Sequence, residues 1–331
     1  MREELECGYC SHPAASPTQC KGGVTRAHTV QRRGGLAAIA EAGHVLTFKP
    51  TLKAMIEHNG RPPPRSIGIG RASVFPGFCN RHDSDLFKAV EGQDLSLDGQ
   101  GAFLLSYRAI AYERFSKEVQ LESLGIQRQM DKGHPFWKQV SIQRQIHPHE
   151  WGARRGLADV TRWKADYDSR LLSGALDGFH FLAVRFSGLL PIVACGAFHA
   201  EVDLSGNLLQ RLARGDGDLE HLALNITSYR GQTVMVLGWI GSTSGPAAAF
   251  AQSFSTLDDA RKADSVVRMA FEQSDNIFIR QSWWAGLPTD QQQRLMEQMW
   301  SGTPQAKRRM DSLVDRGSNL AFADVVDLVT G

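Results

Sequence analysis

Two short pairs of Cys and His residues in the first quarter of the chain have the spacing of a metal site. Two residues separate Cys7 from Cys10, and two residues separate Cys79 from His82. This spacer lets both side chains face one cation from a tight turn whose backbone amides can donate to the sulfurs. Three sulfurs and one nitrogen suit the tetrahedral preference of zinc. We therefore predict a structural Zn²⁺ held by Cys7, Cys10, Cys79 and His82.

Other residues compete for places in this site. Cys20 lies in a Lys-Gly-Gly loop of the same segment, and His28 follows shortly after it, so either could replace one of the four ligands. The chain has five cysteines, an odd number, and four of them precede residue 80. In a reducing compartment this distribution favours a metal over disulfides. Cys195 lies in an apolar run and is expected to be a buried, inert thiol.

Length and composition limit the class of protein. A chain of 331 residues, 42% of them hydrophobic and 22% charged, is expected to form globular domains. Its length favours two of them. It contains no apolar run long enough to cross a membrane and no signal-like start, so we expect a cytoplasmic protein. The net charge is +2, but residues 1–90 hold twelve Lys or Arg against seven Asp or Glu. That modest excess suits a polyanion and equally suits a solvated surface.

The chain divides by pattern into two parts. Residues 1–91 are rich in Gly, Pro and Cys, with strand-like stretches at 24–30, 43–48 and 67–75 and a Pro-rich loop at 58–65. We predict a small zinc-stapled module there and an α+β domain over 92–331.

The second part combines helical and strand periodicity. We expect an antiparallel sheet of about four strands, covered by helices on one face, because β-rich runs bounded by turn residues are followed by helical spacing. The tail after Gly302 is partly polar. The predicted helices span 103–128, 136–147, 162–176, 247–254, 258–271 and 289–300, with Asp258 and Thr289 as N-caps, and the predicted strands span 179–186, 192–198, 222–228 and 233–240.

Two other motifs contain side chains that could take part in binding or catalysis. His147, His149 and Glu150 lie close together, but Pro148 between them indicates a surface loop. Trp283 and the adjacent Trp284 could stack on bases, although adjacent tryptophans at a helix end belong more often to the core.

The order of these elements resembles the zinc-bearing HNH endonuclease module, of the treble-clef or ββα-metal type. In that family a CxxC knuckle precedes a strand that ends in a histidine, and a second knuckle opens the final helix. Here Cys7 and Cys10 precede a strand-like stretch that holds His28, and Cys79 and His82 precede Asp83. The resemblance covers residues 5–90.

The resemblance implies a metal-dependent nuclease acting on DNA or RNA. His28 would be the general base, and Asp83 would bind a catalytic Mg²⁺ or Mn²⁺, which carboxylates suit. Arg26, Arg32 and Arg33 flank His28 and could grip phosphates. Bacterial proteins of this layout often belong to mobile-element or phage-defence settings.

The alternative is a non-catalytic zinc-stabilised module that binds nucleic acid or protein. His28 would then only hydrogen-bond within the module, and Asp83 would only complement the exposed amides at a helix start. The two hypotheses differ in geometry, because a nuclease requires His28 and Asp83 to converge.

Overall fold

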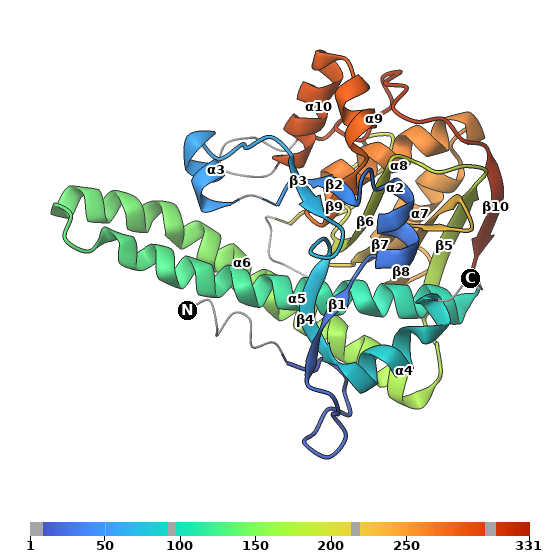
Figure 1. Cartoon of the computed structure of the whole chain (residues 1–331), viewed down its shortest axis with the longest axis horizontal. Coiled ribbons are helices and arrows are strands. Elements are labelled where there is room, and N and C mark those ends of the chain that lie inside the picture. The colour runs from blue at the N-terminus through green and yellow to red at the C-terminus, as the bar shows by residue number, and fades with distance from the viewer. Residues whose placement is uncertain (1–8, 50, 92–96, 213–218, 302–308) are drawn as a thin grey trace.

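The computed structural model describes residues 9–49, 51–91, 97–212, 219–301 and 309–331. Its N-terminal part is a two-stranded ribbon followed by a helix. Strand β1 (Val24–His28) pairs antiparallel with β4 (Val74–Cys79), and α4 (Asn80–Glu91) follows β4 directly. This ββα unit lies at the lower side of the molecule in Figure 1. The strand predicted over 24–30 is therefore present in β1.

A long insertion separates the two strands of this unit. It contains β2 (His44–Thr47) and β3 (Arg65–Gly68), which pair with each other. The single strand predicted over 67–75 is wrong, since a turn that includes Ser73 at a φ of 55° separates β3 from β4. Short helical turns complete the insertion, namely η1 (Arg32–Leu36), α2 (Ala37–Ile39) and α3 (Leu52–Glu57).

The main sheet is larger than the sequence predicts. It has eight strands in the order β10-β5-β8-β7-β6-β9-β2-β3, and every pairing is antiparallel. The four predicted strands are confirmed as its centre, and β2 and β3 join them through β9. The other strands of this sheet are β5 (Phe179–Phe186), β6 (Ile192–Phe198), β7 (Leu222–Tyr229), β8 (Gln232–Ile240), β9 (Ile277–Ile279) and β10 (Val325–Thr330).

Both faces of this sheet are buried, whereas the sequence predicts helices on one face. Along β8, Met235 and Leu237 pack into one core with Phe250 of α7, while Val234 and Val236 pack into another with α5 and α6. This alternation is the period of two expected for a strand with a core on each side. The helices on the first face are α7 (Pro246–Ser255), α8 (Asp259–Gln273) and α10 (Thr289–Met299), and the short α9 (Gln281–Gly286) precedes α10.

Two long helices cover the other face and form an antiparallel hairpin that extends beyond the body (Figure 1). They are α5 (Gly99–Arg128) and α6 (Phe136–Ser173), with the short η2 (Gln129–Asp131) between them. Gly238 lets α5 approach β8 closely, since a Cβ there would lie 2.1 Å from Ser106 Oγ. None of the described helices is both long and apolar enough to span a bilayer.

The helix α6 corrects two expectations. Separate helices were expected at 136–147 and 162–176, with a loop at Pro148, but one helix continues through Pro148. His147 and His149 are exposed on it, and Glu150 pairs with Arg128 and Arg154. A proline in a helix removes one backbone hydrogen bond, and packing against α5 holds the two halves in line.

The remaining helices agree with the sequence pattern, apart from their caps. The cap positions are Asp258 for α8, without a side-chain capping bond, and Pro288 rather than Thr289 for α10. The chain end is also better ordered than its polarity indicates, because β10 pairs with β5. The mixed α+β class is confirmed.

Residues on both sides of position 91 share one core. Phe75, Phe78 and Phe87 of the ββα unit pack with Phe103 of α5 and Phe179 of β5. The strands β2 and β3 likewise belong to the main sheet. A domain boundary at residue 91 stays a prediction about independent folding.

Buried His221 gives the fold a definite pH response. Its ring stacks on Trp163 with centroids 4.3 Å apart, and burial lowers the pKa of His221 to about 3. The unfolded chain takes up this proton near pH 6.5, so stability falls as pH falls from about 6.5 towards 3. We predict that His221→Phe reduces the loss of unfolding free energy between pH 7 and pH 5 by about 2 kcal/mol, measured by urea denaturation. Equal losses in both proteins would contradict this assignment.

Candidate metal centre

Four side chains from three segments converge beside the start of α4. They are Cys10 and Cys20 from the loop before β1, Cys79 at the end of β4 and His82 in the first turn of α4. Their ligand atoms all lie within 4.8 Å of one another. The four residues thus form a cluster that can hold a metal ion.

The distances within this cluster fit a tetrahedral ion. The Nδ1 atom of His82 lies 3.2 Å from the sulfur of Cys10, 3.3 Å from that of Cys79 and 3.9 Å from that of Cys20. Zinc bonds of ordinary length place a sulfur and a nitrogen about 3.6 Å apart on a tetrahedron. Three thiols and one imidazole are also a donor set that zinc accepts.

Three of the four predicted ligands lie in this cluster. Cys10, Cys79 and His82 lie together as predicted, while Cys20, the alternative from the sequence, supplies the fourth ligand atom. Cys7 lies outside the described residues. Four ligands complete a structural zinc shell, so this cluster has no need of a fifth.

Two glycines explain how Cys20 reaches the cluster. Gly22 has a φ of +79° and Gly23 a φ of +68°, which residues with side chains rarely adopt. The backbone then returns to α4, where the amide of Asn80 donates to the carbonyl of Gly23 over 3.0 Å. A Cβ on Gly22 would lie 2.8 Å from Asn80 Cβ. The Gly-Gly pair after Cys20 was the available sequence signal for this ligand.

Groups around the cluster hold the ligands in place. The amide of His82 lies 3.5 Å from the Cys79 sulfur, as in a knuckle whose backbone donates to a thiolate. The ring of His12 stacks on that of His82, with centroids 4.0 Å apart. Next to Cys10, the buried ammonium of Lys164 donates to the carbonyl of Ser11 over 2.8 Å.

A second polar cluster lies along α4 and the adjoining end of β1. Arg108 of α5 is only 1% exposed, stacks over Phe87 and donates to Glu91 over 2.5 Å. The charges of Arg108 and Glu91 both influence the pKa of His28 and the pKa of Asp83. His28 and Asp83 therefore share one electrostatic environment.

The imidazole of His28 is held with one nitrogen available. Burial lowers the pKa of His28. A hydrogen bond with the Ile69 backbone opposes this shift, because a bond that the ring donates favours the protonated form. The Nε2 atom is buried and has no hydrogen-bond partner among the described residues. If Nδ1 is the donor, the Nε2 lone pair is left as the acceptor.

Asp83 is held in a comparable way. It lies in the first turn of α4, and its Oδ1 atom is buried without a hydrogen-bond partner in the described part of the chain. Burial raises the pKa of Asp83, and the guanidinium of Arg108 opposes the shift. Buried polar atoms of this kind ordinarily have partners, so both atoms are available to a ligand.

The other candidates from the sequence have structural roles. Trp284 stacks on Phe271, and the Trp283 indole donates to the carbonyl of Leu320, so both belong to the core as the commoner interpretation holds. Cys195 is fully buried, and burial raises its thiol pKa to about 12. A thiol in that state is not a nucleophile.

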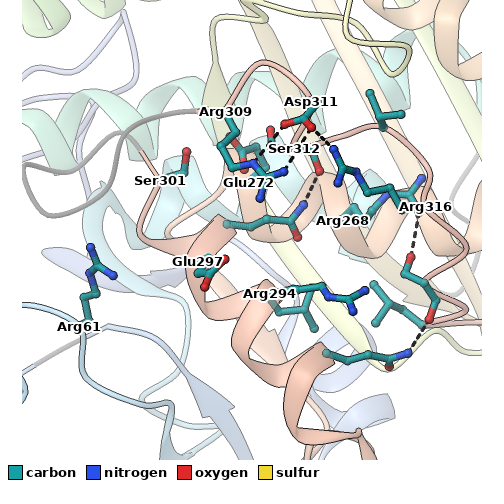
Figure 2. Close-up of a pocket in the computed structure, with 16 residues that line it drawn as sticks. Arg61, Arg268, Glu272, Arg294, Glu297, Ser301, Arg309, Asp311, Ser312 and Arg316 are labelled. Atoms are coloured by element: carbon teal, nitrogen blue, oxygen red, sulfur yellow. Dashed lines mark hydrogen bonds and ion pairs between the residues drawn. The ribbon is translucent and has the colours of Figure 1, made fainter.

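A separate cavity of about 670 Å³ lies between α8, α10 and residues 309–320 (Figure 2). Five arginines line it, but four of them pair with carboxylates. Arg309 and Arg316 both contact Asp311, and the positive charge of this cavity is balanced largely within the protein. The remaining pairs are Arg294 with Asp290 and Arg268 with Asp264.

Comparison of the chain with protein-family models, with curated proteins and with solved structures gives no match. The assignment of function therefore depends on the geometry of the two clusters.

The ligand set can be tested by metal analysis. We predict that Cys10→Ser, Cys20→Ser and Cys79→Ser each lower the zinc content of the purified protein by at least half, because a structural site with three ligands binds far more weakly. Inductively coupled plasma mass spectrometry measures this directly. Cys195→Ser is the matched control, and we expect Cys7→Ser to retain zinc as well. Loss of zinc in Cys7→Ser together with retention in Cys20→Ser would restore the ligand set predicted from the sequence.

Proposed function

We propose that this chain is a divalent-metal-dependent nuclease of the HNH type, with His28 as the general base. One observation supports this above all. The Nε2 atom of His28 and the Oδ1 atom of Asp83 are both buried and available, and both residues lie in the electrostatic environment of the Arg108–Glu91 pair. A nuclease requires these two residues to converge on one cation, whereas a binding module does not.

Zinc has a structural role in this proposal. Cys10, Cys20, Cys79 and His82 complete the coordination shell, so no position is left for water or substrate. The ion would fix the start of α4 against the loop before β1. Because Asp83 follows His82 directly, this also fixes the carboxylate relative to β1 and His28.

His28 suits the task of a base at neutral pH. Its neutral form predominates because burial lowers its pKa. The Nε2 atom can then accept a proton from an attacking water.

Asp83 supplies an oxygen ligand of the kind that Mg²⁺ and Mn²⁺ prefer. A bound divalent cation would polarise the phosphodiester and stabilise the leaving oxygen. Arg26, Arg32 and Arg33 are exposed around β1 and are placed to contact the phosphates of a substrate.

Removing the base tests the chemistry. We predict that His28→Ala lowers Mg²⁺- or Mn²⁺-dependent cleavage of DNA or RNA by about 100- to 10,000-fold while zinc content and the thermal unfolding midpoint stay unchanged. Asp83→Ala should also lower activity, and a higher Mn²⁺ concentration should partly restore it, since only affinity for the cation is lost. Cleavage is measured on end-labelled oligonucleotides separated by gel electrophoresis.

His44→Ala is the matched control, because His44 is an exposed histidine on β2. Zinc loss in His28→Ala would make His28 a ligand. A wild-type protein that binds nucleic acid but cuts none with any divalent cation would favour the non-catalytic zinc module.

The pH dependence provides an independent check. The base acts in its neutral form, and the pKa of His28 lies below the ordinary value of about 6.5. We predict that kcat/KM falls as pH falls, with a midpoint below 6.5, and that the residual activity of His28→Ala lacks this limb. A wild-type midpoint above 6.5 would contradict the assignment of His28 as a buried base.

A further inference from the structure

The end of the α5–α6 hairpin projects from the body as a separate feature (Figure 1). We call residues 127–155 the hairpin tip. Leu124, Ile146 and Ala153 form a small core of their own between the two helices, next to Leu121 and Ile142. The tip is therefore built to hold a fixed shape away from the main core.

Large apolar side chains are exposed on this tip. Phe136 is 80% exposed, Trp137 is 71% exposed and Trp151 is 56% exposed. At these exposures the rings of Phe136 and Trp137 bury little area within the fold. The adjacent exposed rings of Phe136 and Trp137 indicate a surface that contacts another molecule.

The tip is also strongly basic. It holds six Lys or Arg and three His against two Asp or Glu. Both acidic residues have partners within the tip. Glu150 pairs with Arg128 and Arg154, and Asp131 accepts a hydrogen bond from the side-chain amide of Gln143. The exposed side chains of Lys132, Lys138 and Arg144 provide the excess charge.

Phe136 is the one of these three exposed rings that lines an open groove of about 610 Å³ on the tip. Phe136, Arg128, Arg144 and His147 line it together with Gln139 and Gln143. Flat apolar rings beside cations match the bases and phosphates of an unpaired strand. A membrane surface fits less well, because the inward residues Ile142 and Ile146 are used in the hairpin core and leave no continuous apolar face for lipid.

We propose that the hairpin tip binds single-stranded nucleic acid, with Phe136 and Trp137 stacking on bases and Lys138 and Arg144 contacting phosphates. Lys164, beside the metal cluster, lies 27 residues after Trp137 on the same helix, which corresponds to about 40 Å. At about 3.4 Å per stacked nucleotide the tip contacts a strand on the order of twelve nucleotides from the ββα unit. That role in presenting a substrate rests on the proposed nuclease function, whereas binding does not.

Binding is measured without cleavage, by fluorescence anisotropy of labelled oligothymidylate in the absence of added divalent cations. Because a stacked base contributes about 1–3 kcal/mol, we predict that Trp137→Ala weakens binding at least fivefold. Phe322→Ala is the matched control, since Phe322 is 75% exposed elsewhere on the body, and it should leave affinity unchanged. Arg144→Gln should reduce the slope of log affinity against log salt concentration by about 0.7.

Three results would overturn the proposal. The first is an affinity of Trp137→Ala for oligothymidylate equal to that of the wild type. The second is an equal loss of affinity in Phe322→Ala. The third is that Trp137→Ala loses only its binding to phosphatidylserine vesicles, measured by sedimentation. The proposal is also separable from the nuclease function. His28→Ala should bind oligothymidylate as the wild type does, and binding that depends on Trp137 would stand even if no metal supports cleavage.

Discussion

The convergence of three thiols and one imidazole on a single point is the constraint on which the N-terminal structure depends. Four donor atoms this close together favour a cation between them, because thiolates would otherwise repel one another. The convergence fixes the loop before β1, the end of β4 and the start of α4 together. The positions of His28 and Asp83 follow from it, since one lies on β1 and the other directly follows a ligand.

The metal centre is anchored to the rest of the molecule through a buried charge. Lys164 of α6 reaches the Ser11 carbonyl beside Cys10, and its ammonium also contacts Asp168 and the hydroxyl of Tyr107. A buried ammonium is tolerated because a carboxylate and two oxygens surround it. These contacts thus hold the loop that carries Cys10 against the α5–α6 hairpin.

Local patterns in the sequence predicted local structure well. Periodicity gave β5 to β8 and the helices after residue 246, and knuckle spacing gave three of the four clustered ligands. Features that depend on distant partners were predicted less well, and Cys20 was only an alternative ligand in the sequence. Cys20 is oriented by left-handed glycines, β2 joins the sheet only through β9, and Pro148 stays helical because α5 supports it. In each case tertiary context outweighed the local preference.

The insertion between β1 and β4 also affects the order in which parts of the fold can form during translation. All residues of the metal cluster have been made by His82, whereas β2 acquires β9, its partner on the side of the sheet centre, roughly 230 residues after its own end. At typical translation rates this interval lasts about 10 to 50 seconds. During it the β2–β3 hairpin is an open edge, a condition that promotes pairing with other chains. Closure of the cysteine cluster around a metal ion would hold the two ends of the insertion together through that interval. Metal supply during translation would then bear on the yield of folded protein.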